Sequence, residues 1–415
     1  MNTRRRFVGF LEERLGLDVL LGLARNKLVP IHASTPFYYF GGMAIFLFLV
    51  QIGTGILLSL YYKPSPDQAF ESVQAIVTEV DFGWLIRSAH SWSANLLVGV
   101  LFLHLLTTFM MRAYRRPREL TWMTGIVLLG LFLAFGFSGY LLPWNELAFF
   151  ATRVGTAIVG VVPVVGKQLL LLARSGEDVT GDTLARFYSL HVVVLPMLTF
   201  AVLGVHLFLV QKHGMSVPEK IVADARSKGG LRAMPFLPHF LLRDMVGWYL
   251  ALAILAALAA LFPWELGDKA DPFKPAPDNI KPEWYFLFMF QALKVLPAHL
   301  GPFEGEVVGV LFFGACGLIV LFAPFLDRGK ISRAVLASLA AVAVAFFIAM
   351  TSWGWFSGAE QTTLRVILGG IQTVVVLPLL IPFTAPGSNG RKLVYAGLTL
   401  AIAVLAVATW WETLG

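Results

Sequence analysis

The 415-residue chain has few charged residues and a single cysteine. Charged residues make up 14% of the sequence and hydrophobic residues 57%, which lies far outside the composition of soluble domains. The lone Cys316 excludes an internal disulfide, a cysteine-held iron–sulfur cluster and haem attachment through a CxxCH motif. A redox cofactor in this chain would therefore be held by other side chains.

Basic residues exceed acidic ones, yet no basic segment is interleaved with stacking aromatic residues. The net charge of +7 therefore does not indicate nucleic-acid binding, and no nucleic-acid partner is expected. The excess of basic residues is better explained by membrane topology and by attraction to anionic lipid.

Apolar runs of about 20 residues recur along the chain, and each is long enough to cross a hydrocarbon core of about 30 Å. They predict repeated membrane spans, because a signal peptide would give one such run at the start. Runs bounded by charges, proline or glycine give nine expected helices: 37–62, 88–111, 120–142, 184–210, 244–263, 306–326, 333–353, 364–384 and 392–411. The predicted fold class is all-α, a polytopic transmembrane helical bundle.

Most of the 32 Lys and Arg residues fall in connections on one side of this bundle. By the positive-inside rule that side is cytoplasmic, so we expect the N-terminus inside and the C-terminus outside. Residues 1–30 carry charges on one face and apolar side chains on the other, which predicts a helix lying on the inner membrane surface.

Two expected helices each carry two histidines. His90 and His104 are fourteen residues apart, and His191 and His206 are fifteen apart. At about 100° and 1.5 Å per residue, both spacings are close to four turns, so each pair shares one broad face. Both helices run inward, which places His90 level with His191 and His104 level with His206.

Two bis-histidine sites at separate depths suit two planar macrocycles, whereas the levels are too far apart for one metal cluster. No cysteine or nearby carboxylate completes a zinc site. We therefore expect two non-covalent b haems in a four-helix di-haem core, with His90 and His191 as ligands of the outer iron and His104 and His206 of the inner iron. The alternative is four core histidines satisfied by hydrogen bonds, which their matched depth disfavours.

Four glycines repeat the histidine period. Gly41 and Gly55, and likewise Gly125 and Gly139, are fourteen residues apart. Close packing of membrane helices also uses small residues, but a porphyrin edge needs a missing side chain, and the shared period favours haem contacts.

Two arginines are candidates for haem propionates. Arg87 lies one turn before His90, at the outer level, and Arg118 lies at the inner level. Both arginines also fit the alternative of interfacial anchors.

A polar motif, Pro282-Glu283-Trp284-Tyr285, ends the long connection after 244–263. A carboxyl group beside Phe and Trp is expected to have a raised pKa, so Glu283 could take a proton from a bound hydroquinone. Tyr285 could orient that carboxyl group or bind the ring. The motif is also typical of a membrane-surface anchor.

The PEWY motif, the two histidine pairs and the stretch Gly139-Tyr140-Leu141-Leu142-Pro143-Trp144 together resemble the cytochrome b family of cytochrome bc1 and b6f complexes. The resemblance covers nearly all of residues 7–330, and FGWLIRSAHSWSANL, RPRELTW and RFYSLHVVVLP are especially close to the b6-type N-terminal half. It implies quinol oxidation at an outer site built from Tyr140, the connection 151–166 and residues Glu283, Trp284 and Tyr285.

The resemblance also implies a Q cycle. One electron leaves to a Rieske iron–sulfur protein, and the other crosses both haems to an inner quinone, to which Asp244 could deliver a proton. A charged helix cap is the alternative interpretation of Asp244. The implied activity is that of a quinol:cytochrome c oxidoreductase, with a cytochrome c-type subunit, lipid and a second copy of the complex as partners in a prokaryotic-type plasma membrane.

The sequence departs from the family pattern in places. The b6 lineage binds a third haem covalently through a cysteine, whereas Tyr39 occupies that position here, so no covalent haem is expected. Ser91 replaces an arginine of the plastid pattern beside the outer ligand. The fifteen-residue histidine spacing is b6-type, yet the chain continues unbroken through PEWY as bc1-type proteins do. The helices after 364 have no predicted role.

The expected organisation is a surface helix (1–30), a four-helix di-haem domain (31–220), a C-terminal cytochrome b domain (221–330) and additional transmembrane helices (331–415). One alternative function is the two-haem anchor subunit of a formate dehydrogenase or hydrogenase, which has no use for PEWY. Another is a secondary transporter that uses His and Glu as a proton relay, but such folds usually show inverted repeats, which this sequence lacks.

Overall fold

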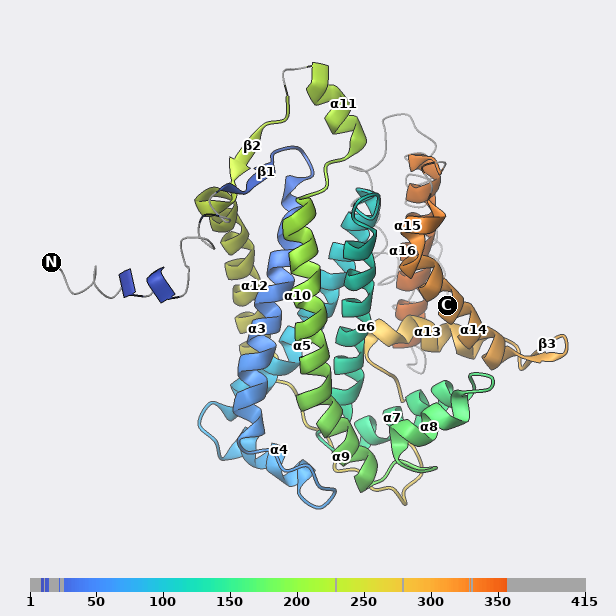
Figure 1. Ribbon diagram of the computed structural model, residues 1–415. Coiled ribbons are helices and arrows are strands. Elements are labelled where there is room, and N and C mark those ends of the chain that lie inside the picture. The colour runs from blue at the N-terminus through green and yellow to red at the C-terminus, as the bar shows by residue number, and fades with distance from the viewer. Residues whose placement is uncertain are drawn as a thin grey trace, which may run out of the picture.

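The computed structural model is a bundle of long helices with short elements at its two ends (Figure 1). It describes residues 26–227, 230–277, 280–327 and 331–356, together with residues 9, 10, 12–14, 22 and 329. Six helical segments in these ranges are long and apolar enough to span a membrane: Thr35–Ser59, Gly83–Met110, Glu119–Leu141, Gly181–His213, Phe236–Leu261 and Arg333–Trp355. Each overlaps an expected helix, so the all-α transmembrane fold is confirmed.

The expected helix 306–326 is divided into two pieces. α14 (Gly305–Leu321) is too short to count as a full span, and α15 (Ala323–Leu326) follows it with Pro324 in its first turn. Proline has no backbone N–H with which to continue a helical ladder, which explains the break. The expected helices 364–384 and 392–411, and most of the surface helix 1–30, lie outside the described residues.

Four helices form the middle of the bundle: α3 (Tyr39–Ser59), α5 (Gly83–Met110), α6 (Glu119–Leu141) and α10 (Leu195–His213). α3 packs along α5, α6 packs along α10, and α12 (Leu241–Leu261) covers α3 and α5. The shared core consists of Ala44, Leu47, Phe48, Leu97, Leu128, Phe132 and Ala251. The outward faces also carry exposed apolar side chains such as Leu49, Ile56 and Val205, as expected of helices in lipid.

The two ends of the bundle differ in structure (Figure 1). At the first end, called the α4 end below, lie α4 (Ala69–Thr78), α7 (Glu146–Gly160), α8 (Gly166–Arg174) and α9 (Gly181–Ser189). At the other end, the β1–β2 end, strand β1 (Leu28–Pro30) pairs antiparallel with β2 (Ala233–Pro235) near α11 (Glu219–Ser227). This pairing ties the segment before α3 to the connection before α12.

α13 (Trp284–Val295) is a short helix that packs mainly on α16 (Arg333–Phe356). A small hairpin, β3 (His299–Leu300) and β4 (Phe303–Glu304), leads from it into α14.

The connection that leads from α12 to α13 is held at the α4 end. Asn145 accepts a hydrogen bond from the N–H of Ala148 and so caps α7. Its amide Nδ2 also donates to the carbonyl of Leu266 over 2.6 Å, and Lys269 pairs with Glu71 of α4. The connection that precedes the PEWY motif is thereby attached to α4 and to the start of α7.

Candidate functional site

A π-helical turn accounts for the unequal histidine spacings. His90 and His104 lie on the regular helix α5, whereas His191 lies in the π-helical turn Leu190–Val194 between α9 and α10, and His206 lies on α10. A π-helical turn adds one residue to a helix. Fifteen residues that include this turn therefore advance about as far around the helix as fourteen in α5, and both pairs keep a common face.

The structure brings together the histidine pairs that the sequence predicted. The ring centroids of His90 and His191 lie 6.4 Å apart, which leaves room for a metal held by two metal–nitrogen bonds of about 2 Å. His104 and His206 are also close enough to interact electrostatically. Two imidazoles that face each other at this distance suit iron that takes its other four ligands from a porphyrin. Among the described residues, no group of three or more His, Cys, Asp or Glu side chains could hold a metal.

Each predicted glycine lies beside one of these imidazoles. A Cβ added at Gly41 would lie 3.4 Å from Cε1 of His104, and one at Gly55 would lie 3.3 Å from Cε1 of His90. On α6, a Cβ at Gly125 would lie 3.2 Å from Cε1 of His206, and one at Gly139 would lie 2.6 Å from Cε1 of His191. A Cβ would overlap the ring at Gly139, crowd it at Gly125 and Gly55, and touch it at Gly41. The glycines thus form a cradle at each of the two levels.

Hydroxyl side chains next to the glycines, which sequence reasoning missed, reach the same imidazoles. Three hydroxyl oxygens lie within hydrogen-bond distance of a histidine Nδ1: Thr54 to His90 2.9 Å, Thr124 to His206 3.0 Å and Ser138 to His191 3.1 Å. The fourth equivalent position is Phe40, and Nδ1 of His104 has no partner among the described residues. The sequence pattern that could have pointed to them is that each of these residues directly precedes one of the four glycines.

The two arginines predicted to face propionates are engaged by backbone carbonyls. Arg87 is buried and donates to the carbonyls of Trp264 and, over 3.1 Å, Glu265. Arg118 donates to the carbonyl of His213 over 3.0 Å, at the end of α10. Both guanidinium groups therefore tie chain segments together, and their pairing with propionates stays a prediction.

The residues predicted for quinol chemistry lie together at the start of α13. Partial burial raises the pKa of Glu283 to about 7. Tyr140 of α6 and Tyr285 of α13 both interact electrostatically with Glu283. The Tyr285 hydroxyl fills the space that a side chain at Gly136 would need, which explains how α6 accepts it so closely.

Trp284, the first residue of α13, is held between α5 and α16. Its indole ring lies 6.1 Å, centroid to centroid, from both Phe102 of α5 and Phe347 of α16. Its Nε1 donates to the side chain of Asn95 over 2.8 Å, a partner that sequence reasoning also missed.

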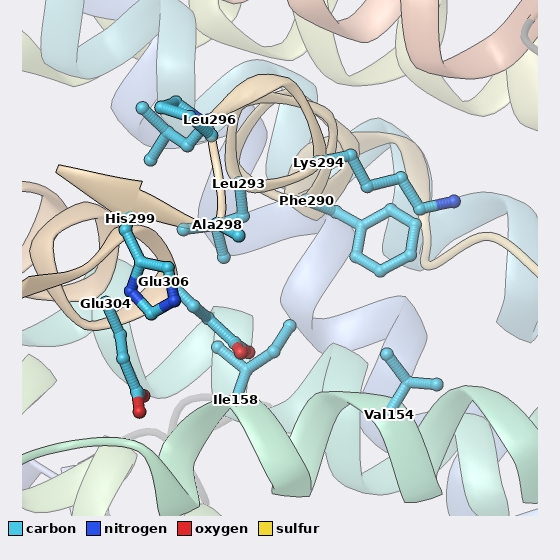
Figure 2. Close-up of a pocket in the computed structure, with 11 residues that line it drawn as sticks. Val154, Ile158, Phe290, Leu293, Lys294, Leu296, Ala298, His299, Glu304 and Glu306 are labelled. Atoms are coloured by element: carbon cyan, nitrogen blue, oxygen red, sulfur yellow. The ribbon is translucent and has the colours of Figure 1, made fainter.

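A cavity of about 460 Å³ lies between α7 and the second half of α13 (Figure 2). Val154 and Ile158 of α7 form one wall, and Phe290 of α13 lies across from them. The remaining lining residues are Leu293, Lys294, Leu296, Pro297, Ala298, His299, Glu304 and Glu306. Figure 2 shows His299, Glu304 and Glu306 gathered at one end of the cavity. Its volume and its mixture of apolar walls with a few polar groups are typical of a small-molecule site.

At the opposite end, Asp244 of α12 is buried with its carboxylate against Gly42 of α3. Its Oδ1 has no hydrogen-bond partner among the described residues. Nearby, the ring of Tyr39 packs on Phe240 at 5.1 Å between centroids. Since a buried carboxylate oxygen without a partner is costly, Asp244 is a candidate contact for a polar ligand.

Comparisons with known proteins show which family the chain resembles. The family profile described as Cytochrome b/b6/petB matches residues 25–214, and that described as Cytochrome b(C-terminal)/b6/petD matches residues 269–377. A cytochrome bc complex cytochrome b subunit of Chlorobaculum thiosulfatiphilum is 48% identical over 329 residues, covering 79% of this chain and 75% of that protein. A chain of a solved hyperthermophilic respiratory Complex III is similar with a TM-score of 0.71 and 29% identity, over 98% of this chain and 99% of that one.

Proposed function

Because the chain belongs to the cytochrome b family of bc-type electron-transport complexes, we propose that it oxidises quinol at the α4 end and reduces quinone at the β1–β2 end. The family is a membrane-bound, haem-carrying one, so iron and haem follow from membership. The α4 end is the outer side in this proposal, since the basic connections are expected to be cytoplasmic.

Two non-covalent b haems would be held by the four histidines, His90 with His191 and His104 with His206. Each haem supplies one-electron transfer at its level when bound. The fit is supported by the 6.4 Å between the rings of His90 and His191 and by the glycine beside each imidazole. Tyr39 offers no thiol for a covalent third haem.

The observation that carries quinol oxidation is the position of Glu283. This carboxyl group, with its pKa raised to about 7, lies beside Tyr140 and Tyr285 at the start of the helix that lines the cavity. A group that titrates near neutral pH can accept a proton from quinol and release it to water. The cavity of about 460 Å³ lies farther along the same helix, between α7 and the second half of α13, and has the volume for a quinol ring. Trp284 holds the start of α13 through its hydrogen bond to Asn95.

We further propose where electrons and protons leave the chain. Oxidation of one quinol yields two electrons and two protons. One electron passes to a Rieske iron–sulfur protein and on to a cytochrome c-type subunit, and the other crosses the bundle to quinone. Asp244, whose Oδ1 has no partner among the described residues, donates a proton to the reduced quinone. The active complex is a homodimer in this proposal.

The division into domains stays as predicted from the sequence. The two family matches, at 25–214 and 269–377, support a di-haem domain at 31–220 and a separate C-terminal domain that contains PEWY, for which we keep the proposed bounds 221–330. The surface helix at 1–30 and the helices after 331 complete the proposed organisation in a prokaryotic-type plasma membrane.

The experiment that tests the function starts with the purified complex. A dithionite-reduced minus oxidised spectrum, acid–acetone extraction and a haem-to-protein ratio should give two extractable b haems per chain. Addition of quinol should then reduce both haems. A complex without haem, or haems that quinol does not reduce, would contradict the proposal.

A further inference from the structure

The hydroxyl group of Thr54 determines which nitrogen of His90 carries the proton. Its Oγ1 lies 2.7 Å from the carbonyl of Val50, to which it donates its only hydrogen. Toward Nδ1 of His90, 2.9 Å away, the same oxygen must therefore accept. Nδ1 of His90 is thus protonated, and the lone pair of Nε2 is free to bind a metal.

The same arrangement occurs at His206 and His191, whose hydroxyl neighbours both lie on α6. Thr124 donates to the carbonyl of Leu120 over 2.9 Å and so accepts from Nδ1 of His206. Ser138 is placed in the same way toward Nδ1 of His191, with the carbonyl of Phe135 at 3.3 Å from its Oγ. Three of the four imidazoles are therefore fixed by hydroxyl acceptors.

His104 is the exception. Phe40 stands before Gly41 as Thr54 stands before Gly55, fourteen residues later on the same face of α3. The Phe40 ring stacks with Phe37 at 6.3 Å and offers no acceptor. Nδ1 of His104 is accordingly buried without a hydrogen-bond partner in the part of the chain that the structure describes.

We propose that Phe40 makes His104 the weakest electron donor of the four imidazoles, and that this raises the reduction potential of the inner haem relative to the outer one. The proposal rests on the haem binding proposed above. A hydrogen bond from Nδ1–H increases the basicity of a metal-binding imidazole and favours the oxidised iron. His90 and His191 both have such a bond, whereas at the inner level only His206 has one. The two levels would each hold their haem by two histidines, so the hydrogen bond to Nδ1 is what differs between them.

The test compares variants in the purified complex by spectroelectrochemistry, which follows each b haem separately. Phe40→Thr supplies a hydroxyl group beside His104, and Phe40→Val is its isosteric control without one. We expect the ratio of reduced to oxidised inner haem at a fixed potential to fall by several-fold in Phe40→Thr relative to Phe40→Val, where tenfold would equal 59 mV for one electron. The outer haem should not change.

Thr54→Val provides the reciprocal test, because it removes the hydroxyl acceptor from His90 and leaves only the backbone contact with Gln51. Here the outer haem should shift toward the reduced form and the inner haem should stay unchanged. Electron paramagnetic resonance of the oxidised low-spin haems gives a second readout, since the g-values respond to the donor strength of the imidazoles.

Equal inner-haem potentials in Phe40→Thr and Phe40→Val, with both haems bound, would overturn the proposal. If the Phe40 variants do not fold, an unchanged outer potential in Thr54→Val would overturn it equally. A wild-type complex without haem would instead contradict the proposed function, so the two failures are distinguishable.

Discussion

The indole Nε1 of Trp284 donates a hydrogen bond to Oδ1 of Asn95 over 2.8 Å. Asn95 lies on α5, five residues after His90, and its Nδ2 donates to the carbonyl of Ser91 over 3.0 Å. That second bond fixes the amide so that its oxygen faces the indole. The segment that carries Glu283 is thereby joined to the helix that carries two of the four histidines.

Asn95→Leu should slow quinol oxidation while both haems remain bound. The substitution keeps the approximate volume but leaves the indole N–H of Trp284 without its acceptor, which costs about 1–3 kcal/mol and allows Glu283 to shift. Steady-state turnover and the reduced-minus-oxidised spectrum check this expectation. Trp284→Phe added to Asn95→Leu should cause little further loss, because the bond is already absent. If the loss of turnover in the double variant equals the sum of the losses in the two single variants, the hydrogen bond between Trp284 and Asn95 is not the cause of the slower oxidation.

Quinol oxidation should depend on pH through Glu283. Partial burial raises the pKa of this carboxyl group to about 7. Below that pH it is protonated and cannot accept a proton, whereas above it the carboxylate can. The rate should therefore rise as the pH increases through about 7, and Glu283→Gln should lower the rate and flatten the rise. Identical pH profiles for wild type and Glu283→Gln would exclude this role.

Gly139→Ala should cause loss of the outer haem. A Cβ at Gly139 would lie 2.6 Å from Cε1 of His191, and the ring cannot move away without leaving its position opposite His90. Gly130→Ala on the same helix is the matched control, because its Cβ would meet nothing within 4 Å. The haem-to-protein ratio should fall only in Gly139→Ala. Full haem content in that variant would count against the predicted cradle.

Asp327→Asn should destabilise the β1–β2 end. The carboxylate accepts hydrogen bonds from the Tyr114 hydroxyl over 2.8 Å and from Arg115 Nε over 3.1 Å. Burial raises the pKa of Asp327, but these bonds outweigh it and hold the pKa below its ordinary value. A lowered pKa stabilises the fold above the pKa of the unfolded chain, about 3.9, and this contribution is lost as the pH falls through the folded value.

The expected loss in the free energy of unfolding for Asp327→Asn is about 1–3 kcal/mol at neutral pH, visible as a lower midpoint of thermal unfolding. Glu219→Gln is the control. It removes the other, exposed partner of Arg115 and should change stability by less than about 1 kcal/mol. Equal midpoints for the two variants would contradict the prediction.

Much of the fold was readable because a bilayer imposes simple requirements. Apolar runs long enough to span it must form helices, and the segments expected at 88–111 and 120–142 agree with α5 and α6. The short helices α7 and α8 were not predicted, since nothing in the interfacial segment 146–174 has the length of a span. The break before Pro324 was missed because the apolar run continues through it.

The sequence by itself determined the four histidines, the four glycines and the PEWY motif, because a helical period converts their spacing directly into shared faces and levels. Only the tertiary structure decided how these faces meet. The π-helical turn at His191 reconciles spacings of fourteen and fifteen residues, and the partners of Nδ1 come from a neighbouring helix. Contacts of this kind depend on the rotation and depth of one helix against another, which no pattern within a single helix records.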